Sequence, residues 1–260
     1  MEYKNTIYEK SEGIATITIN RPKVFNAFNE ETVSEVLDQL EDARKDENVR
    51  VIIITGAGDR SFSAGADINV MKGMNPLGAR KLSIMGYNIC TKIEKLEKPV
   101  IAAINGYALG GGLELAMACD LRIASEKVRM GQTEINIGFI PGWGGTQRLP
   151  RFVGKTMAKE MIYTGKMIDA KTAEQLGLLN KVVPPDQLMT TARELAAEIA
   201  SKAPVAIGVS KSLIDSSLET NLEVGLAHER EGFAVVASTE DLQEGVSAFF
   251  EKRKPKFKGK

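Results

Sequence analysis

Apolar and polar residues alternate early in the chain and later recur with a helical period. This change predicts strands and helices in the first half and helices alone in the last third. Residues 14–19 place threonines between apolar side chains, which is typical of a strand. Residues 49–56 and 100–106 are short apolar runs that end at glycine, and they predict buried strands. Two further short segments, 121–125 and 128–131, follow the glycine-rich helix at 110–119.

Apolar residues spaced three or four positions apart predict the helices. The first helix begins after Asn29, which can cap it, and places Val33, Val36 and Leu40 on one face. The stretch 56–69 is rich in small residues and is predicted to be a loop. The helical period also covers 77–96, 144–149, 155–163, 170–176, 186–201, 204–217, 221–237 and 239–251.

Strand, loop and helix recur at 14–45, 49–96 and 100–119 without a low-complexity linker between them. Such an order predicts an α/β fold with a parallel sheet, because successive parallel strands need a helical crossover. The helices of the last third are too few to form an obvious second enzyme domain. We expect them to cover the core or a neighbouring subunit.

Composition narrows the classes of function. The chain has 260 residues, which allows one large domain or a domain with an appendage, and its hydrophobic content of 43% supports a sizeable core. Lys plus Arg number 34 and Asp plus Glu number 34, so the chain has no general attraction to nucleic acid or to an anionic membrane. Cys90 and Cys119 are isolated and predict free thiols in a reducing compartment. The start lacks an apolar signal region and no run reaches ~18 apolar residues, so we expect a cytoplasmic protein.

Three glycines at 110–112 stand directly before an apolar helical pattern, and Glu114 follows within the first turn. A glycine turn lets the backbone approach a ligand, and the start of a helix presents unpaired N–H groups. A carboxylate on such an apolar helix is costly unless it is paired or used. Two other interpretations remain: the glycines serve only helix–strand packing, and Glu114 is solvated.

A second carboxylate, Glu134, lies among apolar residues in the segment 132–145. Apolar surroundings can raise the pKa of a carboxyl group so that it holds a proton near neutral pH. The sequence therefore predicts an acid/base site made of Glu114, Glu134 and backbone donors for an oxyanion. In the loop 56–69, Ala66 is a candidate for a second backbone donor, and the alternative is an ordinary loop in which Asp67 caps a turn.

Other kinds of site have weak support. The only histidine, His228, lies in a late helical segment and no G-x-S-x-G sequence is present, which disfavours a Ser-His-Asp triad. Cysteines, histidine and carboxylates do not show a metal-ligand spacing, so we expect no metal. The tail 249–260 combines Phe249 and Lys252 with further basic residues. It is either a solvated tail, a grip for an adenine nucleotide, or a nucleic-acid contact, which the zero net charge disfavours.

Several long motifs, in one order over nearly the whole chain, make it resemble the crotonase (enoyl-CoA hydratase/isomerase) superfamily, and most of all its short-chain hydratases and 3-hydroxyacyl-CoA dehydratases. The motifs are ITINRPKVFNAFN, FSAGADI, KPVIAAINGYALGGGLELAMACD, GQTEINIGFIPGWGGTQRL, AEQLGLLNKVV and STEDLQEGVSAFFEKRKPKF. The resemblance implies a spiral of ββα units over 1–200 and a C-terminal helical trimerisation region over 201–260. It also implies a homotrimer or a homohexamer built as a dimer of trimers.

The resemblance assigns roles to particular residues. The N–H groups of Ala66 and Gly111 would form the oxyanion hole for the thioester carbonyl of an acyl-CoA, and Glu114 and Glu134 would be the catalytic acids. Coenzyme A, which enters with the substrate, would lie along Lys23, Val24, Ala64, Ala66, Asp67, Ile68 and Gly111, with Phe249 and Lys252 reaching the coenzyme A of a neighbouring subunit. Asn69 departs from the family pattern, because many hydratases carry lysine there.

The implied reaction is reversible syn addition of water to a trans-2-enoyl-CoA, without a separate cofactor, metal or membrane. Trp143, with Phe139 and Ile140, is expected to close the acyl pocket and favour short chains. Such chains are crotonyl-CoA, hydrated to 3-hydroxybutyryl-CoA, and acryloyl-CoA, formed from 3-hydroxypropionyl-CoA. The alternatives are a Δ3,Δ2-enoyl-CoA isomerase and an RNA-binding protein on the same fold.

Overall fold

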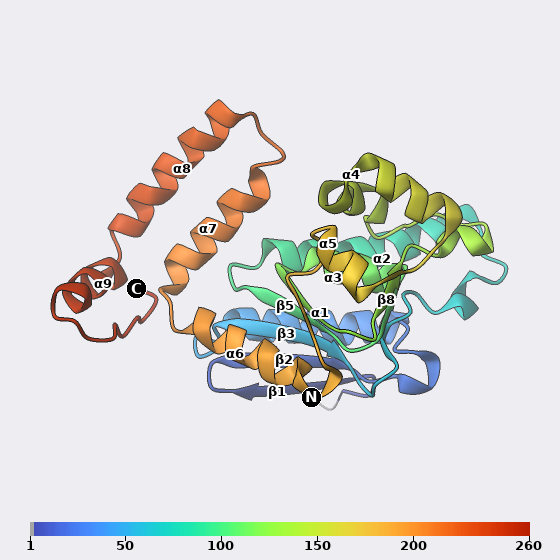
Figure 1. The fold of residues 1–260 in the computed structure, drawn as a ribbon, viewed down its shortest axis with the longest axis horizontal. Coiled ribbons are helices and arrows are strands. Elements are labelled where there is room, and N and C mark those ends of the chain that lie inside the picture. The colour runs from blue at the N-terminus through green and yellow to red at the C-terminus, as the bar shows by residue number, and fades with distance from the viewer. Residues whose placement is uncertain (1–2) are drawn as a thin grey trace.

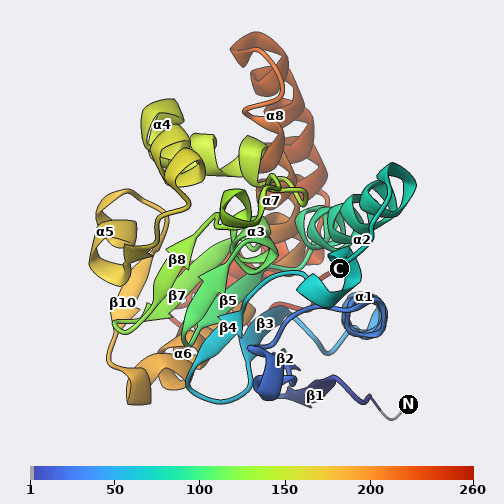
Figure 2. The ribbon, with the colours of Figure 1, turned by 90° about the vertical axis from the view of Figure 1, so that its right-hand side faces the viewer.

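A six-stranded sheet forms the centre of the computed structural model, which describes residues 3–260. The strand order is β1-β2-β3-β5-β7-β10, with β1 antiparallel to β2 and the other pairs parallel. Figure 2 shows the strands in this order, from β1 at the right to β10 at the left. The bounds are β1 (Thr6–Ser11), β2 (Ile14–Ile19), β3 (Val51–Gly56), β5 (Val100–Ile104), β7 (Leu121–Ser125) and β10 (Lys181–Val183).

The central strands β3 and β5 are buried on both faces of the sheet, which explains their continuous apolar runs. Successive side chains of a strand point to opposite faces. In β3, Ile52 and Ile54 join one hydrophobic cluster, whereas Val51 and Ile53 join another on the opposite face. The first cluster packs under the helices α1, α2 and α3, and the second packs against α6.

A second, four-stranded sheet was not predicted. Its order is β4-β6-β8-β9, with bounds β4 (Ser61–Ser63), β6 (Tyr107–Leu109), β8 (Arg129–Gly131) and β9 (Ile168–Asp169). The first three follow β3, β5 and β7 in the chain and pair in parallel with one another. The chain therefore winds as a spiral of repeated turns. The loop prediction for 56–69 is wrong over 61–63, because a strand of three residues is too short to show a period.

The helices agree with the predicted segments to within a few residues. Their bounds are α1 (Glu30–Lys45), α2 (Pro76–Lys95), α3 (Gly111–Ala118), α4 (Gly145–Thr164), α5 (Ala170–Gln175), α6 (Leu188–Ala200), α7 (Pro204–Ser216), α8 (Leu222–Ala237) and α9 (Glu240–Phe250). Asn29 caps α1 as predicted, because its side chain accepts the N–H of Thr32 at 2.8 Å. The two segments predicted over 144–163 form α4, interrupted at Gly154 with φ of 76°.

Residues 204–260 form a C-terminal arm that extends away from the sheet (Figure 1). Large apolar side chains on the arm are exposed, among them Leu222, Phe233, Phe249 and Phe250. The expected core range 1–200 ends with α6, and its first two residues lie outside the described part of the chain. Between residues 3 and 260, no helix is both long and apolar enough to cross a membrane.

Candidate active site

The turn before α3 brings the backbone close to its neighbours, and glycine is required there. Gly110 has φ of 53° and ψ of −125°, and α3 begins at Gly111. A Cβ on Gly112 would lie 2.1 Å from the carbonyl oxygen of Ser63, the last residue of β4. The packing interpretation of these glycines is therefore correct for Gly112, and this packing also fixes the position of the helix start.

The loop after β4 lies directly against that helix start. Gly65 has φ of 87°, and a Cβ there would lie 2.7 Å from the backbone nitrogen of Gly111. Ala66 follows and forms an isolated parallel bridge with Phe28. Ala66 and Gly111 both line a cavity of about 160 Å³. The structure thus brings together the two residues predicted as backbone donors for an oxyanion.

Glu114 lies one turn into α3, every residue of which is buried, and its own exposure is 1%. Its Oε1 accepts the N–H groups of Trp143 at 2.7 Å and of Gly145 at 2.6 Å. Burial raises the pKa of Glu114 to about 7, while the two N–H groups and the charge of Arg148 act in the opposite direction. The interpretation of Glu114 as a solvated residue is wrong, and the carboxyl group can exchange a proton near neutral pH.

Glu134 begins a short 3-10 helix, Glu134–Ile137, and lines the same cavity as Glu114. Burial, and to a lesser extent the negative charge of Glu114, together raise the pKa of Glu134 to about 8. With its amide nitrogen facing this carboxylate, the buried Gln132 donates to both Glu134 oxygens, at 3.0 and 3.1 Å. The raised pKa of Glu134 agrees with the prediction that this residue can hold a proton near neutral pH.

Trp143 forms a fixed wall of the cavity and is 4% exposed. Its Nε1 donates to the carbonyl of Leu82 in α2 at 3.1 Å. A Cβ on Gly86 would lie 1.9 Å from Trp143 Cγ, so the missing side chain of Gly86 makes room for the indole ring. Phe139 and Ile140 line the same cavity, although Ile140 is 64% exposed, so closure of an acyl pocket by these residues stays a prediction.

The residues expected along coenzyme A divide into three groups. Ala64 and Ile68 line the cavity together with the donor residues. Asp67 instead caps the 3-10 helix Ile68–Met71, where its side chain accepts the N–H of Asn69 at 3.1 Å and pairs with Arg21 at 3.3 Å. This is the capping role considered above for Asp67. Lys23 and Val24 lie in the 3-10 helix Pro22–Val24, outside the cavity lining.

Phe249 and Lys252 lie on the C-terminal arm, which extends away from the sheet (Figure 1), and neither residue lines this cavity. Phe249 is 79% exposed. The basic tail beyond them is partly tethered, because the carboxylate of Asp241 accepts the N–H groups of Lys258 and Gly259. A contact of Phe249 and Lys252 with coenzyme A in a neighbouring subunit stays a prediction.

The other reactive side chains lie apart from the cavity lining. Burial raises the pKa of both thiols, that of Cys119 to about 12, so they are expected to be unreactive. His228 is exposed on α8. A triad built on His228 thus has no support from its position.

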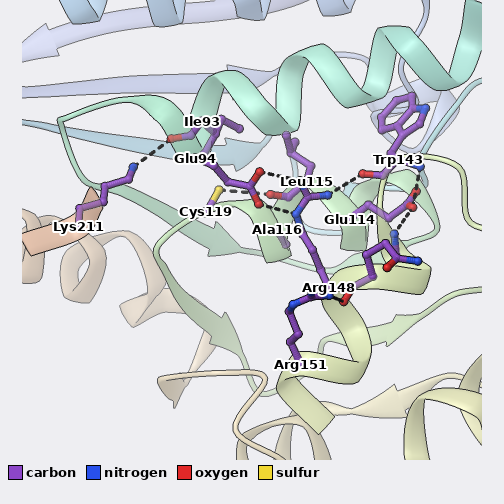
Figure 3. Close-up of polar contacts among 12 residues, drawn as sticks. Ile93, Glu94, Glu114, Leu115, Ala116, Cys119, Trp143, Arg148, Arg151 and Lys211 are labelled. Carbon is purple, nitrogen blue, oxygen red and sulfur yellow. Dashed lines mark hydrogen bonds and ion pairs between the residues drawn. The ribbon is translucent and has the colours of Figure 1, made fainter. Parts of the chain in front are cut away.

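The sequence reasoning missed a pair of charged residues next to Glu114. Arg148 in the first turn of α4 forms a bidentate pair with Glu94 of α2 and also donates to the Trp143 carbonyl (Figure 3). A cation in the first turn of a helix opposes the helix dipole. That local conflict was the available signal that Arg148 has a specific partner.

Comparisons with known proteins agree with this geometry. The family model described as "Enoyl-CoA hydratase/isomerase" matches residues 9–260. A protein from Clostridium acetobutylicum, "Short-chain-enoyl-CoA hydratase", is 50% identical over 254 residues, which cover 98% of this chain and 97% of the relative. "Crotonyl-CoA hydratase" from Syntrophomonas wolfei is 45% identical, with 99% of each chain covered. The crystal structure of an enoyl-CoA hydratase from Bacillus anthracis superposes with a TM-score of 0.96, at 41% identity, covering 99% of this chain and 100% of that one.

Proposed function

The chain belongs to the enoyl-CoA hydratase/isomerase family, and we propose that it adds water reversibly to short-chain trans-2-enoyl-CoA thioesters through Glu114, Glu134 and a backbone oxyanion hole. The resemblance described from the sequence motifs is confirmed at the level of the family and of the crotonase fold. One observation carries the proposal: two carboxyl groups with raised pKa face one cavity together with Ala66 and Gly111.

The chemistry follows from these positions. The N–H groups of Ala66 and Gly111 stabilise the negative charge that develops on the thioester oxygen, which is often the largest single catalytic contribution. Glu114, ionised, takes a proton from water while the water oxygen bonds to C3 of the enoyl group. The electrons of the C2=C3 double bond move toward the thioester, and Glu134 gives its proton to C2. Dehydration reverses each step, and the two carboxyl groups exchange roles.

The wall of the cavity supports a preference for short acyl groups. Trp143 is fixed between Gly86 and Gly111, since a Cβ on Gly111 would lie 2.8 Å from its ring. Together with Phe139 and Ile140 it lines a cavity of about 160 Å³, which shares Phe139 with an adjoining cavity of about 570 Å³. The proposed substrates are crotonyl-CoA and the pair acryloyl-CoA and 3-hydroxypropionyl-CoA. Coenzyme A arrives as part of the substrate.

The C-terminal arm supports a homo-oligomer, a trimer or a dimer of trimers. Phe233, Phe249 and Phe250 are 79%, 79% and 77% exposed in the single chain. Large exposed apolar surfaces are typical of protein–protein contacts. Light scattering coupled to size-exclusion chromatography measures the mass in solution, and a monomer would contradict this part of the proposal.

The decisive assay follows the absorbance of the enoyl-thioester band of crotonyl-CoA. The wild-type protein is expected to remove the conjugated band and to incorporate oxygen from H₂¹⁸O into the product. Glu114→Gln and Glu134→Gln are each expected to lose at least ~10²-fold in kcat, because each removes one proton transfer. Unchanged activity in both variants would refute the mechanism. Loss of a 3-enoyl substrate without ¹⁸O incorporation would instead indicate the isomerase.

A further inference from the structure

Residues 143–145 hold Glu114 from two sides. Trp143 and Gly145 each donate a backbone N–H to Glu114 Oε1, at 2.7 and 2.6 Å. The peptide group between these two donors has its carbonyl on Trp143, and this carbonyl accepts from Arg148 Nη1 at 2.7 Å. Arg148 therefore binds the one peptide group that lies between the two donors of Glu114.

Arg148 is itself held rigidly. Its Nε and Nη2 donate to the two carboxylate oxygens of Glu94 at 2.5 and 2.7 Å. Such a bidentate pair fixes the orientation of the guanidinium group as well as its position. The side chains of Arg148 and Glu94 are 16% and 34% exposed, so the pair is only partly in contact with solvent. Figure 3 shows the guanidinium group between Glu94 and Trp143, with Glu114 on the other side of the loop.

Gly144 shows how closely the loop and the guanidinium group fit. Its φ is 109°, a conformation that favours glycine. A Cβ on Gly144 would lie 2.0 Å from Arg148 Nη1. The glycine thus allows both the turn of the backbone and the approach of the cation.

The charge of Arg148 also acts on Glu114. Burial favours the protonated form of Glu114, and the positive charge of Arg148 favours the ionised form. The other titratable groups around this carboxyl are Glu134 from the 134–137 helix and the thiol of Cys90 from α2. Arg148 is the cation among these groups, and it comes from α4.

We propose that Arg148, oriented by Glu94, is a positioning residue that holds residues 143–145 so that their N–H groups keep Glu114 ionised and correctly aimed. The proposal rests on the proposed role of Glu114 as the base. It gives the ion pair between Glu94 of α2 and Arg148 of α4 a role in the reaction, although neither side chain needs to touch the substrate.

The first test compares Arg148→Gln with Arg151→Gln. Arg151 lies on the same helix, is exposed and donates to the carbonyl of Gln147, so it is a matched control. In Arg148→Gln, ¹³C-glutamate NMR without substrate is expected to show Glu114 titrating about one pH unit higher than in the wild type. The acidic limb of kcat/KM is expected to shift by the same amount, and kcat to fall about 10²-fold. Arg151→Gln is expected to match the wild type.

An unchanged titration of Glu114 in folded Arg148→Gln would overturn the proposal. If Arg148→Gln does not fold, Arg148→Lys decides, because it keeps the charge but loses the bidentate pair. It is expected to keep the acidic limb and to lose about tenfold in kcat, and an unchanged kcat would contradict positioning by Arg148. A wild-type protein without hydratase activity would refute the proposed function, whereas the NMR titration still reports on Arg148.

Discussion

Gly65 and Gly111 face each other so closely that a Cβ atom on Gly65 would lie 2.7 Å from the Gly111 nitrogen. The two loops that supply the proposed oxyanion donors thus meet through backbone atoms alone. Backbone donors that are already in position need no rearrangement during the reaction, which is the condition for strong electrostatic stabilisation.

Gly65→Ala is expected to lower kcat/KM at least ~10²-fold, because the added Cβ displaces the Gly111 N–H. Gly177→Ala is the matched control, since Gly177 has a similar φ of 75° but its Cβ would meet nothing within 4 Å. Both variants carry the strain of positive φ, about 1 kcal/mol. Steady-state kinetics and thermal unfolding separate the two effects. Equal activity losses in both variants would show that strain alone is responsible.

The pH profile of hydration is expected to be bell-shaped. Activity rises as Glu114, with a pKa of about 7, becomes ionised, and falls as Glu134, with a pKa of about 8, loses its proton. Because the two carboxyl groups interact, the measured pKa values belong to the pair. Initial rates of crotonyl-CoA hydration between pH 5 and 10 check this, and a flat profile from 6 to 9 would contradict it.

Stability is expected to respond to pH at the same site. Since folding raises the pKa of Glu134, the favourable contribution of its protonated form is complete below the unfolded pKa and disappears as the pH rises through about 8. Glu134→Gln is therefore expected to raise the free energy of unfolding at pH 9 by about 2 kcal/mol and to change it little at pH 4. Urea denaturation of both proteins at the two pH values measures this. If Glu134→Gln is less stable than the wild type at pH 9, the predicted direction of the stability change is wrong.

Replacing the indole of Trp143 is expected to relax the selection for short chains. Trp143→Phe removes part of the wall while keeping an aromatic ring, so the rate with a C8 enoyl-CoA relative to C4 is expected to rise at least tenfold. Gly86→Ala is the complementary variant, because its Cβ would displace the indole ring of Trp143. It is expected to lower the rate with both substrates. If the wild type already turns over C10 faster than C4, the proposed short-chain preference fails.

A buried lysine attaches the C-terminal arm to the core. Lys211 on α7 donates to Asp120 at 2.9 Å and to the Ile93 carbonyl at 2.9 Å. Lys211→Met leaves Asp120 without its cation, and removing one partner of such a pair typically costs about 3–5 kcal/mol. The double variant with Asp120→Asn is expected to recover part of this loss. Denaturant unfolding of the wild type, the two single variants and the double variant measures the coupling between Lys211 and Asp120. Additive losses in the free energy of unfolding would show that the two residues are not coupled.

The sequence predicted the helices because caps and apolar periods are local. Asn29 caps α1, and the apolar faces of α1 and α2 are buried as their spacing required. The strand β1 escaped prediction because Thr6 is its one buried residue, so its pattern resembles a surface loop. Strands of three residues, such as β4, are defined by their neighbours in space.

The same distinction holds for the candidate site. Glu114 stood out because a carboxylate on an apolar helix conflicts with its surroundings, and Glu134 stood out for a similar reason. Glu94 and Arg148 did not stand out as a pair, because they are 54 positions apart and the unfavourable position of Arg148 at the start of α4 does not identify its partner. Their pairing depends on how α2 and α4 both pack against α3, which no local pattern records.

The spiral of β4, β6 and β8 distributes the site over three successive turns of the chain. The first turn carries Ala66, the second carries Gly111 and Glu114, and the third carries Glu134. In the proposed mechanism, carbonyl polarisation thus belongs to the first two turns, whereas the proton delivered to C2 comes from the third. A relative that differs only in the third turn would still polarise the thioester but would catalyse a different reaction of it. Residues that activate the thioester can therefore stay unchanged while substitutions in the third turn change the reaction that follows.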